Sequence, residues 1–211
     1  MKLIVPLFVL VAAFHAIPSF AAFRVGLVLD TNGKQDKGFN AAAFQGLEKA
    51  RAALGFEAEA VEATNEGDHE TQLKNFAQKG FDLVIALGAS RVGALEKVAR
   101  AFPKAHFAIV DGVVKAPNVR SILFREDQGS FLAGAVAGWF APGKAMGVVA
   151  GMDTPVIQKY LKGFAAGVKH ASPASKVQTR FVGAWNDAPK TTKLAKELYF
   201  NGAEVIYAVA G

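Results

Sequence analysis

Short apolar runs alternate with amphipathic stretches along the chain from residue 23 onward. Each run is too short for a helix of ordinary length, whereas the stretches between them repeat apolar residues at helical spacing. Because strands that alternate with helices are joined by crossover connections, the pattern predicts an α/β protein built on parallel sheets. The expected strands cover residues 23–29, 56–61, 81–87, 106–110, 119–124, 145–150, 177–182 and 204–209. The expected helices cover residues 37–54, 69–79, 92–102, 127–140, 155–170 and 189–200.

The alternation changes near residues 124–127, where a helix rich in small residues follows the fifth expected strand. Five expected strands precede this point and three follow it, which predicts two doubly wound lobes, the second of them incomplete. We expect lobe 1 at residues 22–125, a crossover helix and hinge at 126–143, and a partial lobe 2 at 144–211. The crossover helix has small residues that would let it pack closely against a neighbour: Gly129, Ala133, Gly134, Ala137 and Gly138.

Residues 1–21 have the features of an export leader. Lys2 gives a positive start, and the apolar stretch 3–14 is too short to span a bilayer. Pro18 then precedes a tripeptide, residues 19–21, with small residues at its first and third places. The alternative is a buried N-terminal strand or helix. The order of charge, apolar core and small residues favours a signal peptide and export.

Removal of the leader is therefore expected on export, because signal peptidase cuts after a small residue that has a second small residue two places earlier. Mass spectrometry of the protein found outside the cytoplasm checks this prediction. A mature protein that still begins at Met1 would contradict it.

The composition excludes several classes of function. The formal net charge of +6 is spread along the chain, with no run of Lys and Arg that would form a nucleic-acid arm or a polybasic membrane patch. Cysteine is absent, so disulfides, thiolate metal sites, a cysteine nucleophile and lipid attachment through cysteine are excluded for this sequence. No stretch after the leader reaches the roughly 18 consecutive apolar residues of a membrane-spanning helix.

Motifs of catalysis and cofactor binding are also absent. No GxGxxG follows an expected strand, and no GxSxG elbow is present. Residues 138–144 imitate a phosphate loop, but Ala145 replaces the required Ser or Thr and the segment precedes a strand. The four histidines are isolated from one another. The sequence therefore predicts neither a cofactor nor a metal site, and it favours a binding protein over an enzyme.

Polar and aromatic residues follow several of the expected strands, at the edge of an open parallel sheet where ligands bind. A carboxylate can accept hydrogen bonds from two neighbouring hydroxyl groups, an aromatic face can stack on a planar ring, and an amide offers both a donor and an acceptor. This combination suits a sugar-like polyol joined to a flat ring. The candidate ligand-binding residues are Asp30, Asp36, Phe39, Asn40, Ser90, Asp111, Met152, Asp153 and Trp185.

Several candidates also have a structural alternative. Asp30 and Asp111 could hold the hydroxyl edge of a ribose or hexose, but aspartates at strand ends also cap helices and form turns. Phe39 could stack on a base, with Asn40 binding the edge of that base, or it could pack in the core. Trp185 could contact ligand or fill the base of a loop.

Several segments carry motifs in a distinctive order: residues 30–40 (DTNGKQDKGFN), 107–111 (FAIVD), 124–134 (FREDQGSFLAG), 151–153 (GMD), 163–167 (GFAAG) and 202–211 (GAEVIYAVAG). In this order, and over essentially the whole chain after the leader, they resemble the basic membrane protein family of substrate-binding proteins. The resemblance implies a type I periplasmic-binding-protein fold. In that fold two doubly wound lobes close on a ligand, here a purine nucleoside for delivery to an ABC permease complex in the membrane.

The resemblance also implies roles for individual residues. Phe39 would stack on the base and Asn40 would bind its edge, while Asp30 and Asp111 would hold base or ribose groups. Asp36 matches the second acid of the opening motif. Many members are anchored through a cysteine after the leader. Because this chain has none, we expect a soluble form in the periplasm or at the outer face of the cytoplasmic membrane.

Family members continue beyond the point that matches Gly211, with further ligand contacts and strands that return to lobe 1. We therefore expect the chain to be a truncated product or a fragment. The apolar run 205–209 would leave an open strand edge that promotes association. Nucleoside binding is expected to be at least about a hundredfold weaker than in a full-length relative, because several polar contacts are lost.

Two other functions fit the same fold. A sensory protein would report the ligand to a membrane receptor, and neighbouring permease and ATPase genes would favour import instead. An extracytoplasmic nucleoside-processing enzyme is disfavoured, because no positioned base or metal cluster is visible. DNA-binding repressors of this fold are excluded by the export leader and by the lack of a DNA-reading helical module before Phe23.

Overall fold

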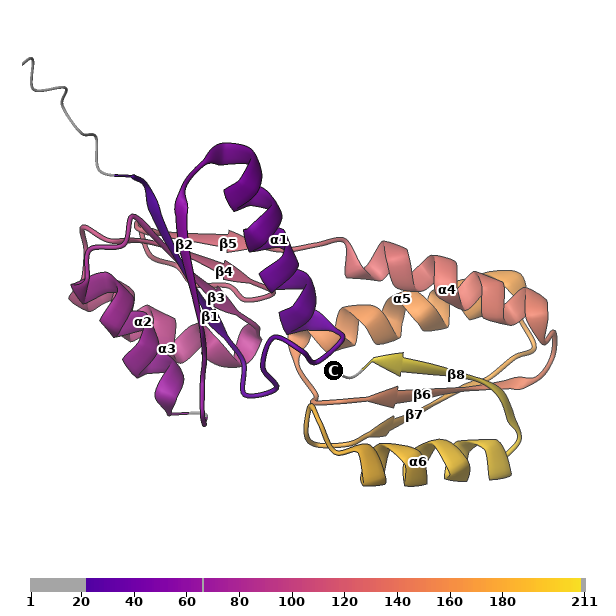
Figure 1. Ribbon diagram of the computed structural model, residues 1–211. Helices are drawn as coiled ribbons and strands as arrows, with labels where there is room; N and C mark the ends of the chain where they lie inside the picture. Colours follow the sequence, from indigo (N-terminus) through magenta and orange to yellow (C-terminus); the bar gives the residue numbers. More distant parts are fainter. Residues whose placement is uncertain (1–21, 66, 210–211) are drawn as a thin grey trace, which may run out of the picture.

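The computed structural model describes residues 22–65 and 67–209 and contains two separate parallel sheets (Figure 1). All pairings between neighbouring strands are parallel, which confirms the predicted class. Across the first sheet the strands are β2 (Glu57–Glu62), β1 (Arg24–Leu29), β3 (Leu83–Leu87), β4 (His106–Val110) and β5 (Val119–Ile122). Across the second they are β7 (Val177–Phe181), β6 (Ala145–Ala150) and β8 (Ala203–Val209).

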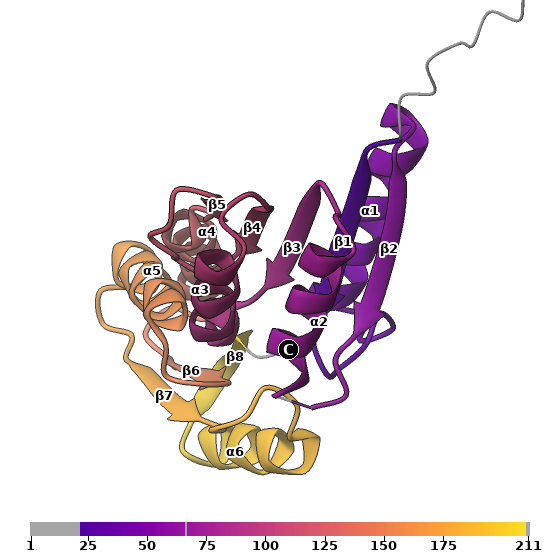
Figure 2. The same ribbon diagram turned by 90° about the vertical axis from the view of Figure 1, so that its left-hand side faces the viewer.

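Helices cover both faces of each sheet, as expected for doubly wound lobes. In the first sheet, α1 (Phe39–Leu54) lies on one face (Figure 2). The other face carries α2 (Asp68–Gln78), the short 3-10 turn η1 (Ala89–Arg91) and α3 (Val92–Ala101). In the second sheet, α4 (Glu126–Phe140) and α5 (Pro155–Ala171) share one face, and α6 (Ala188–Phe200) covers the other.

The predicted elements agree with these bounds to within two residues at every end. Local chemistry explains the ends. Helix α1 ends where Gly55 adopts a left-handed conformation with φ 73°, and its N–H donates to the carbonyl of Arg51 at 2.9 Å. Helix α6 begins after Asp187, whose carboxylate accepts the N–H of Lys190 at 2.9 Å.

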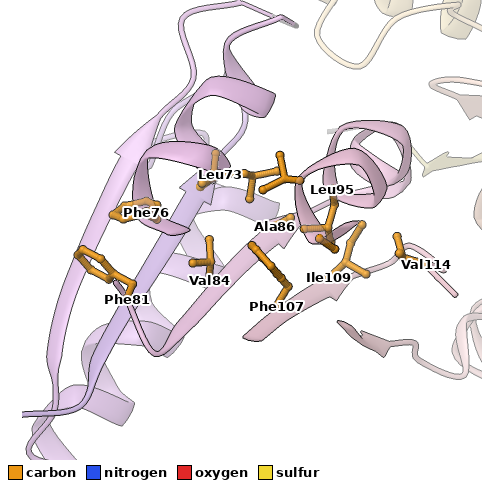
Figure 3. Packing of buried hydrophobic residues seen from close by; sticks show 12 residues of the cluster. Leu73, Phe76, Phe81, Val84, Ala86, Leu95, Phe107, Ile109 and Val114 are labelled. Carbon is orange, nitrogen blue, oxygen red and sulfur yellow. The ribbon is translucent and has the colours of Figure 1, made fainter. Parts of the chain in front are cut away.

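The core of lobe 1 lies between the sheet and helices α2 and α3 (Figure 3). Leu73, Val84, Leu95 and Ile109 are completely excluded from solvent. Val84 and Ile109 lie on the central strands β3 and β4, which explains why these strands are continuous apolar runs in the sequence. The sheet whose carboxyl ends carry the lobe 1 polar residues is therefore packed on a continuous buried core.

Helices α4 and α5 pack with their backbones in close approach. A Cβ atom added at Gly134 would lie inside 3.0 Å of the backbone of Phe164, and one added at Gly167 would meet the backbone of Phe131 in the same way. The expected close packing of the crossover helix is thus confirmed. Gly129 differs from the other glycines of α4, because open space surrounds it.

The chain passes from the first sheet to the second through residues 123–125. Glu126 follows this crossing and is 4 % exposed. One of its carboxylate oxygens accepts the N–H of Phe124 at 3.1 Å, and the other accepts Nζ of Lys159, on α5, at 3.2 Å. The crossing is therefore tied to lobe 2. The exact limits of the lobes, 22–125, 126–143 and 144–211, stay a prediction.

The predicted signal peptide lies outside the described residues. Within the part of the chain that the structure describes, none of the helices combines the length and the apolar character needed to cross a membrane.

Candidate functional site

A cavity of about 480 Å³ lies between the carboxyl ends of the two sheets. Its volume falls in the range of roughly 300 to 1,000 Å³ found for small-molecule sites. The two lobes both contribute to its wall. Lobe 1 supplies the polar residues Asp30, Asn32, Asp36, Asn40, Ser90 and Asp111 together with Phe39. Lobe 2 supplies Thr154, Val156, Ile157, Tyr160, Trp185, Tyr207 and Val209.

Asp36 organises the start of α1. Its carboxylate accepts the backbone N–H groups of Gly38, Asn40 and Ala41 at 2.8 to 3.0 Å, which satisfies amides that have no partner inside the helix. It also accepts Nδ2 of Asn40 at 3.0 Å. Burial raises the pKa of Asp36, but the hydrogen bonds from Ala41, Gly38 and Asn40 outweigh it, so that its pKa is lowered. Both carboxylate oxygens of Asp36 thus serve the loop itself.

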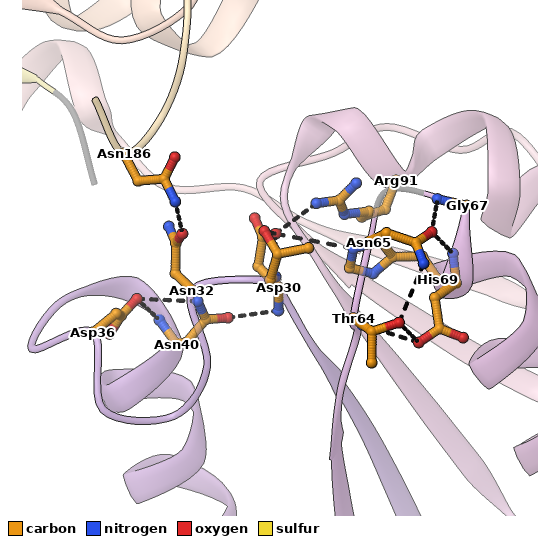
Figure 4. Close-up of polar contacts among 12 residues, drawn as sticks. Asp30, Asn32, Asp36, Asn40, Thr64, Asn65, Gly67, His69, Arg91 and Asn186 are labelled. Carbon is orange, nitrogen blue, oxygen red and sulfur yellow. Dashed lines mark hydrogen bonds and ion pairs between the residues drawn. The ribbon is translucent and has the colours of Figure 1, made fainter. Parts of the chain in front are cut away.

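Asn40 is 2 % exposed and links Asp36 to Asp30 (Figure 4). Its Oδ1 accepts the backbone N–H of Asp30 at 2.8 Å, while its Nδ2 donates to Asp36. A side-chain amide has two N–H groups and two lone pairs on its oxygen. These two contacts use one of the N–H groups and one of the lone pairs of the Asn40 amide.

Phe39 is the first residue of α1 and is 37 % exposed. Its ring faces the cavity beside Gly88, where an added Cβ would lie 4.0 Å from Cε1 of the ring. A core phenylalanine would be buried, so the geometry favours the stacking role over the packing role.

Asp30 does not cap a helix. Its Oδ1 accepts the backbone N–H of Thr31 at 2.5 Å and Nη2 of Arg91 at 2.7 Å, and Nε2 of His69 lies 3.9 Å away (Figure 4). The carboxylate is thus held from the protein side while the residue lines the cavity.

Asp111 combines an unusual backbone conformation with a buried carboxylate oxygen. It is one of two non-glycine residues with positive φ in the described chain, at 58°, and its N–H donates to the carbonyl of Ile122 at 3.0 Å. Its Oδ1 is buried and has no hydrogen-bond partner within the described residues. Burial and the charge of Glu126 raise the pKa of Asp111, and Lys159 opposes this rise.

Three aromatic residues, Tyr160, Trp185 and Tyr207, contribute to the lobe 2 side of the cavity. The ring of Trp185 lies over Gly151, where an added Cβ would approach it to 2.8 Å. The hydroxyl of Tyr207 lies 3.1 Å from Oγ of Ser130, and the Tyr207 ring stacks on Phe164 with 4.6 Å between centroids. Burial and the charge of Asp111 raise the pKa of Tyr160, so its hydroxyl stays protonated at neutral pH.

The structure brings together most of the residues proposed from the sequence, but not all. Asp30, Asp36, Phe39, Asn40, Ser90, Asp111 and Trp185 line one cavity, whereas Met152 and Asp153 are not part of its wall. Asp153 instead accepts Nε2 of Gln158 at 2.7 Å on the surface. Among the described residues, no cluster of three or more His, Cys, Asp or Glu side chains could hold a metal ion.

Sequence reasoning missed Asn32, Tyr160 and Tyr207. Nδ2 of Asn186 donates to Oδ1 of Asn32 at 2.6 Å, which joins the loops of the two lobes (Figure 4). Tyr160 lies in α5, ten residues after the end of β6, and Tyr207 lies within β8. The helical spacing of Thr154, Ile157 and Tyr160 was the available signal for the first of these tyrosines.

Residues 23–211 match the family described as ABC transporter substrate-binding protein PnrA-like. The chain belongs to this family. It is 31% identical over 195 residues to the ABC transporter nucleoside-binding protein BmpA of Lactococcus lactis, covering 89% of this chain and 55% of that protein. It is 32% identical over 199 residues to an uncharacterised lipoprotein of Pyrococcus abyssi, covering 89% of this chain and 49% of that protein.

The fold also matches a solved ABC transporter solute-binding protein from Aeropyrum pernix, with a TM-score of 0.81 and 28% identity. The match covers 90% of this chain and 55% of that one. The predicted type I periplasmic-binding-protein fold is thereby confirmed. This family member spans about half the length of the curated relatives that it matches. The lipoprotein name of the Pyrococcus relative conflicts with our expectation of a soluble, unanchored form.

Proposed function

We propose that this chain is the ligand-binding part of an extracytoplasmic solute-binding protein that holds a purine nucleoside between its lobes and delivers it to an ABC permease. The observation that carries the proposal is a cavity between the lobes that is lined by Phe39, Asn40 and Asp111. Phe39 has an exposed ring, and Oδ1 of Asp111 has no hydrogen-bond partner within the described residues. The family membership and the name of the Lactococcus relative support the transport role and the nucleoside. In this proposal the protein binds no nucleic acid and catalyses no reaction.

The chemistry of a nucleoside matches each part of the wall. The flat base stacks on Phe39, and the free N–H and lone pair of Asn40 meet the edge of the base. The ribose hydroxyls supply the donors that Asp30 and Asp111 can accept. Ser90 and Trp185 are further lobe 1 and lobe 2 contacts in this arrangement.

Calorimetric titration with inosine, guanosine, adenosine, uridine, ribose and myo-inositol tests the proposal. We expect the three purine nucleosides to bind more tightly than uridine, because a purine offers a larger face for stacking. Free ribose should bind more weakly than any of the four nucleosides, because it lacks the base. Preference for a free sugar over all nucleosides would overturn the proposal, and release of hypoxanthine from inosine would reveal an enzyme instead.

Phe39→Ala is expected to weaken inosine binding by roughly 1 to 3 kcal/mol, the value of base–aromatic stacking. The melting temperature should change little, because the ring is exposed in the ligand-free protein. Phe200→Ala is the matched control, since Phe200 is 92 % exposed and lies outside the cavity wall. Unchanged affinity with a collapsed melting temperature would show that Phe39 serves the core.

A further inference from the structure

Arg91 contacts the carboxylate of the cavity residue Asp30 without lining the cavity itself. The Arg91 side chain is 3% exposed and is not part of the cavity wall, although its neighbours Ala89 and Ser90 are. It reaches Asp30 from the end of η1, and His69 approaches the same oxygen from α2. Two basic side chains from separate elements therefore approach one carboxylate oxygen of a residue that lines the cavity.

The contacts of Asp30 divide its two oxygens into different roles. The N–H and the hydroxyl of Thr31, Nη2 of Arg91 and the more distant Nε2 of His69 all approach Oδ1. A carboxylate offers about four lone-pair positions, two on each oxygen. Those of Oδ1 are occupied, so the capacity to accept a ligand donor lies with Oδ2.

The backbone of Asp30 is fixed as well. Its N–H donates to Oδ1 of Asn40, whose amide is in turn held by Asp36. With the main chain held from one side and Oδ1 from the other, the plane of the carboxylate has little freedom. The remaining oxygen is thus presented in a set direction before any ligand arrives, which reduces the ordering cost of binding.

We propose that Arg91 is a positioning residue for ligand binding, which grips Oδ1 of Asp30 from outside the cavity wall so that Oδ2 is presented to a hydroxyl or N–H group of the ligand. The inference deepens the proposed nucleoside site and rests on it for the identity of the ligand. Arg91 itself does not contact the ligand. Its contribution passes through Asp30, and this is the property that an experiment can separate from a general structural role.

A double-mutant cycle separates the two roles. Arg91→Met and Asp30→Asn should each weaken inosine binding by about tenfold or more, as expected for a hydrogen bond to a charged group. Arg91→Met should cause no further loss in the Asp30→Asn background, because the group through which it acts is already altered. Losses that multiply in the double variant would overturn the proposal.

Two further variants control for folding and charge. Arg91→Lys keeps the charge but loses the planar fork, so its affinity should fall between wild type and Arg91→Met. Should Arg91→Met fail to fold, the same cycle is made with Arg91→Lys and is read by the same rule. Arg100→Met removes an exposed arginine that pairs with Glu96 on α3, and it should leave the affinity unchanged.

A ligand-free crystal structure of Arg91→Met, or of Arg91→Lys, separates this inference from the proposed function. We expect the Asp30 carboxylate to rotate away from the N–H of Thr31 once the guanidinium is lost. An unmoved carboxylate would overturn the positioning role whatever the ligand is. If the carboxylate moves in the variant while the wild-type protein binds none of the nucleosides, the positioning role is supported and the nucleoside proposal is contradicted.

Discussion

Gly167→Ala is expected to lower the free energy of unfolding by about 3 kcal/mol, at the upper end of the range for overpacked cores. The added methyl would lie inside 3.0 Å of the carbonyl oxygen of Phe131 and of the backbone nitrogen of Ala135. These are backbone atoms of α4, so no side-chain rotation can relieve the clash. Helices α4 and α5 would have to separate, and the buried apolar contacts between them would be lost.

Gly129→Ala is the matched control on α4. Nothing lies within 4 Å of the position of an added Cβ at Gly129, and the residue is exposed. Replacing a helical glycine by alanine at such a site stabilises by up to about 1 kcal/mol. Thermal unfolding of both variants measures the contrast. If Gly167→Ala melts at the wild-type temperature, helices α4 and α5 do not approach each other as closely as described here.

The elements of both lobes could be predicted from the sequence because apolar runs and helix-ending residues mark them locally. Apolar runs such as residues 83–87 and 106–110 could be recognised as central strands, and stops such as Gly55 ended helices where expected. The small residues of α4 predicted close packing, but not which of them faces α5. Gly134 and Gly129 differ in their surroundings only because the partner helix lies on one side.

Much of the site could be predicted because its polar and aromatic side chains lie at strand ends or in the loops and helix starts that follow them. Asp30 and Asp111 were found in this way, and both line the cavity. Met152 and Asp153 occupy an equivalent place along the chain but are not in the wall, since sequence position does not determine the direction of a loop. Arg91 could not be found, because its partner Asp30 is 61 residues away and only the fold brings them together.

Asp111→Asn is expected to weaken inosine binding by roughly ten- to a hundredfold, the equivalent of about 1.5 to 3 kcal/mol for hydrogen bonds to a charged group. The backbone should be unaffected, because asparagine tolerates the left-handed conformation that Asp111 adopts at φ 58°. The amide can still accept one hydrogen bond but loses the charge. Calorimetry measures the loss, and Asp153→Asn, a surface acid outside the cavity wall, is the control.

The same substitution should stabilise the ligand-free protein at neutral pH. The pKa of Asp111 is raised in the folded state above its ordinary value of 3.8, because burial and the charge of Glu126 disfavour the ionised form. As the pH rises from 3.8 through this raised pKa, the unfolded chain releases its proton while the folded chain retains it, so stability falls across that window. Asparagine has no such proton and loses nothing there.

The pH-dependent stabilisation by Asp111→Asn should therefore grow as the pH rises from 3.8 to the raised pKa. It should stay constant at higher pH and be absent below pH 3.8. Melting temperatures of both proteins, measured without ligand from acid to neutral pH, test this. Ligand binding should show the opposite trend in the wild type, since hydroxyl donors favour the ionised carboxylate and the affinity falls with its protonation. If Asp111 serves ligand binding at a cost in stability, Asp111→Asn should both stabilise the ligand-free protein and weaken binding. Weaker binding with a lower neutral-pH melting temperature would instead assign Asp111 a structural role.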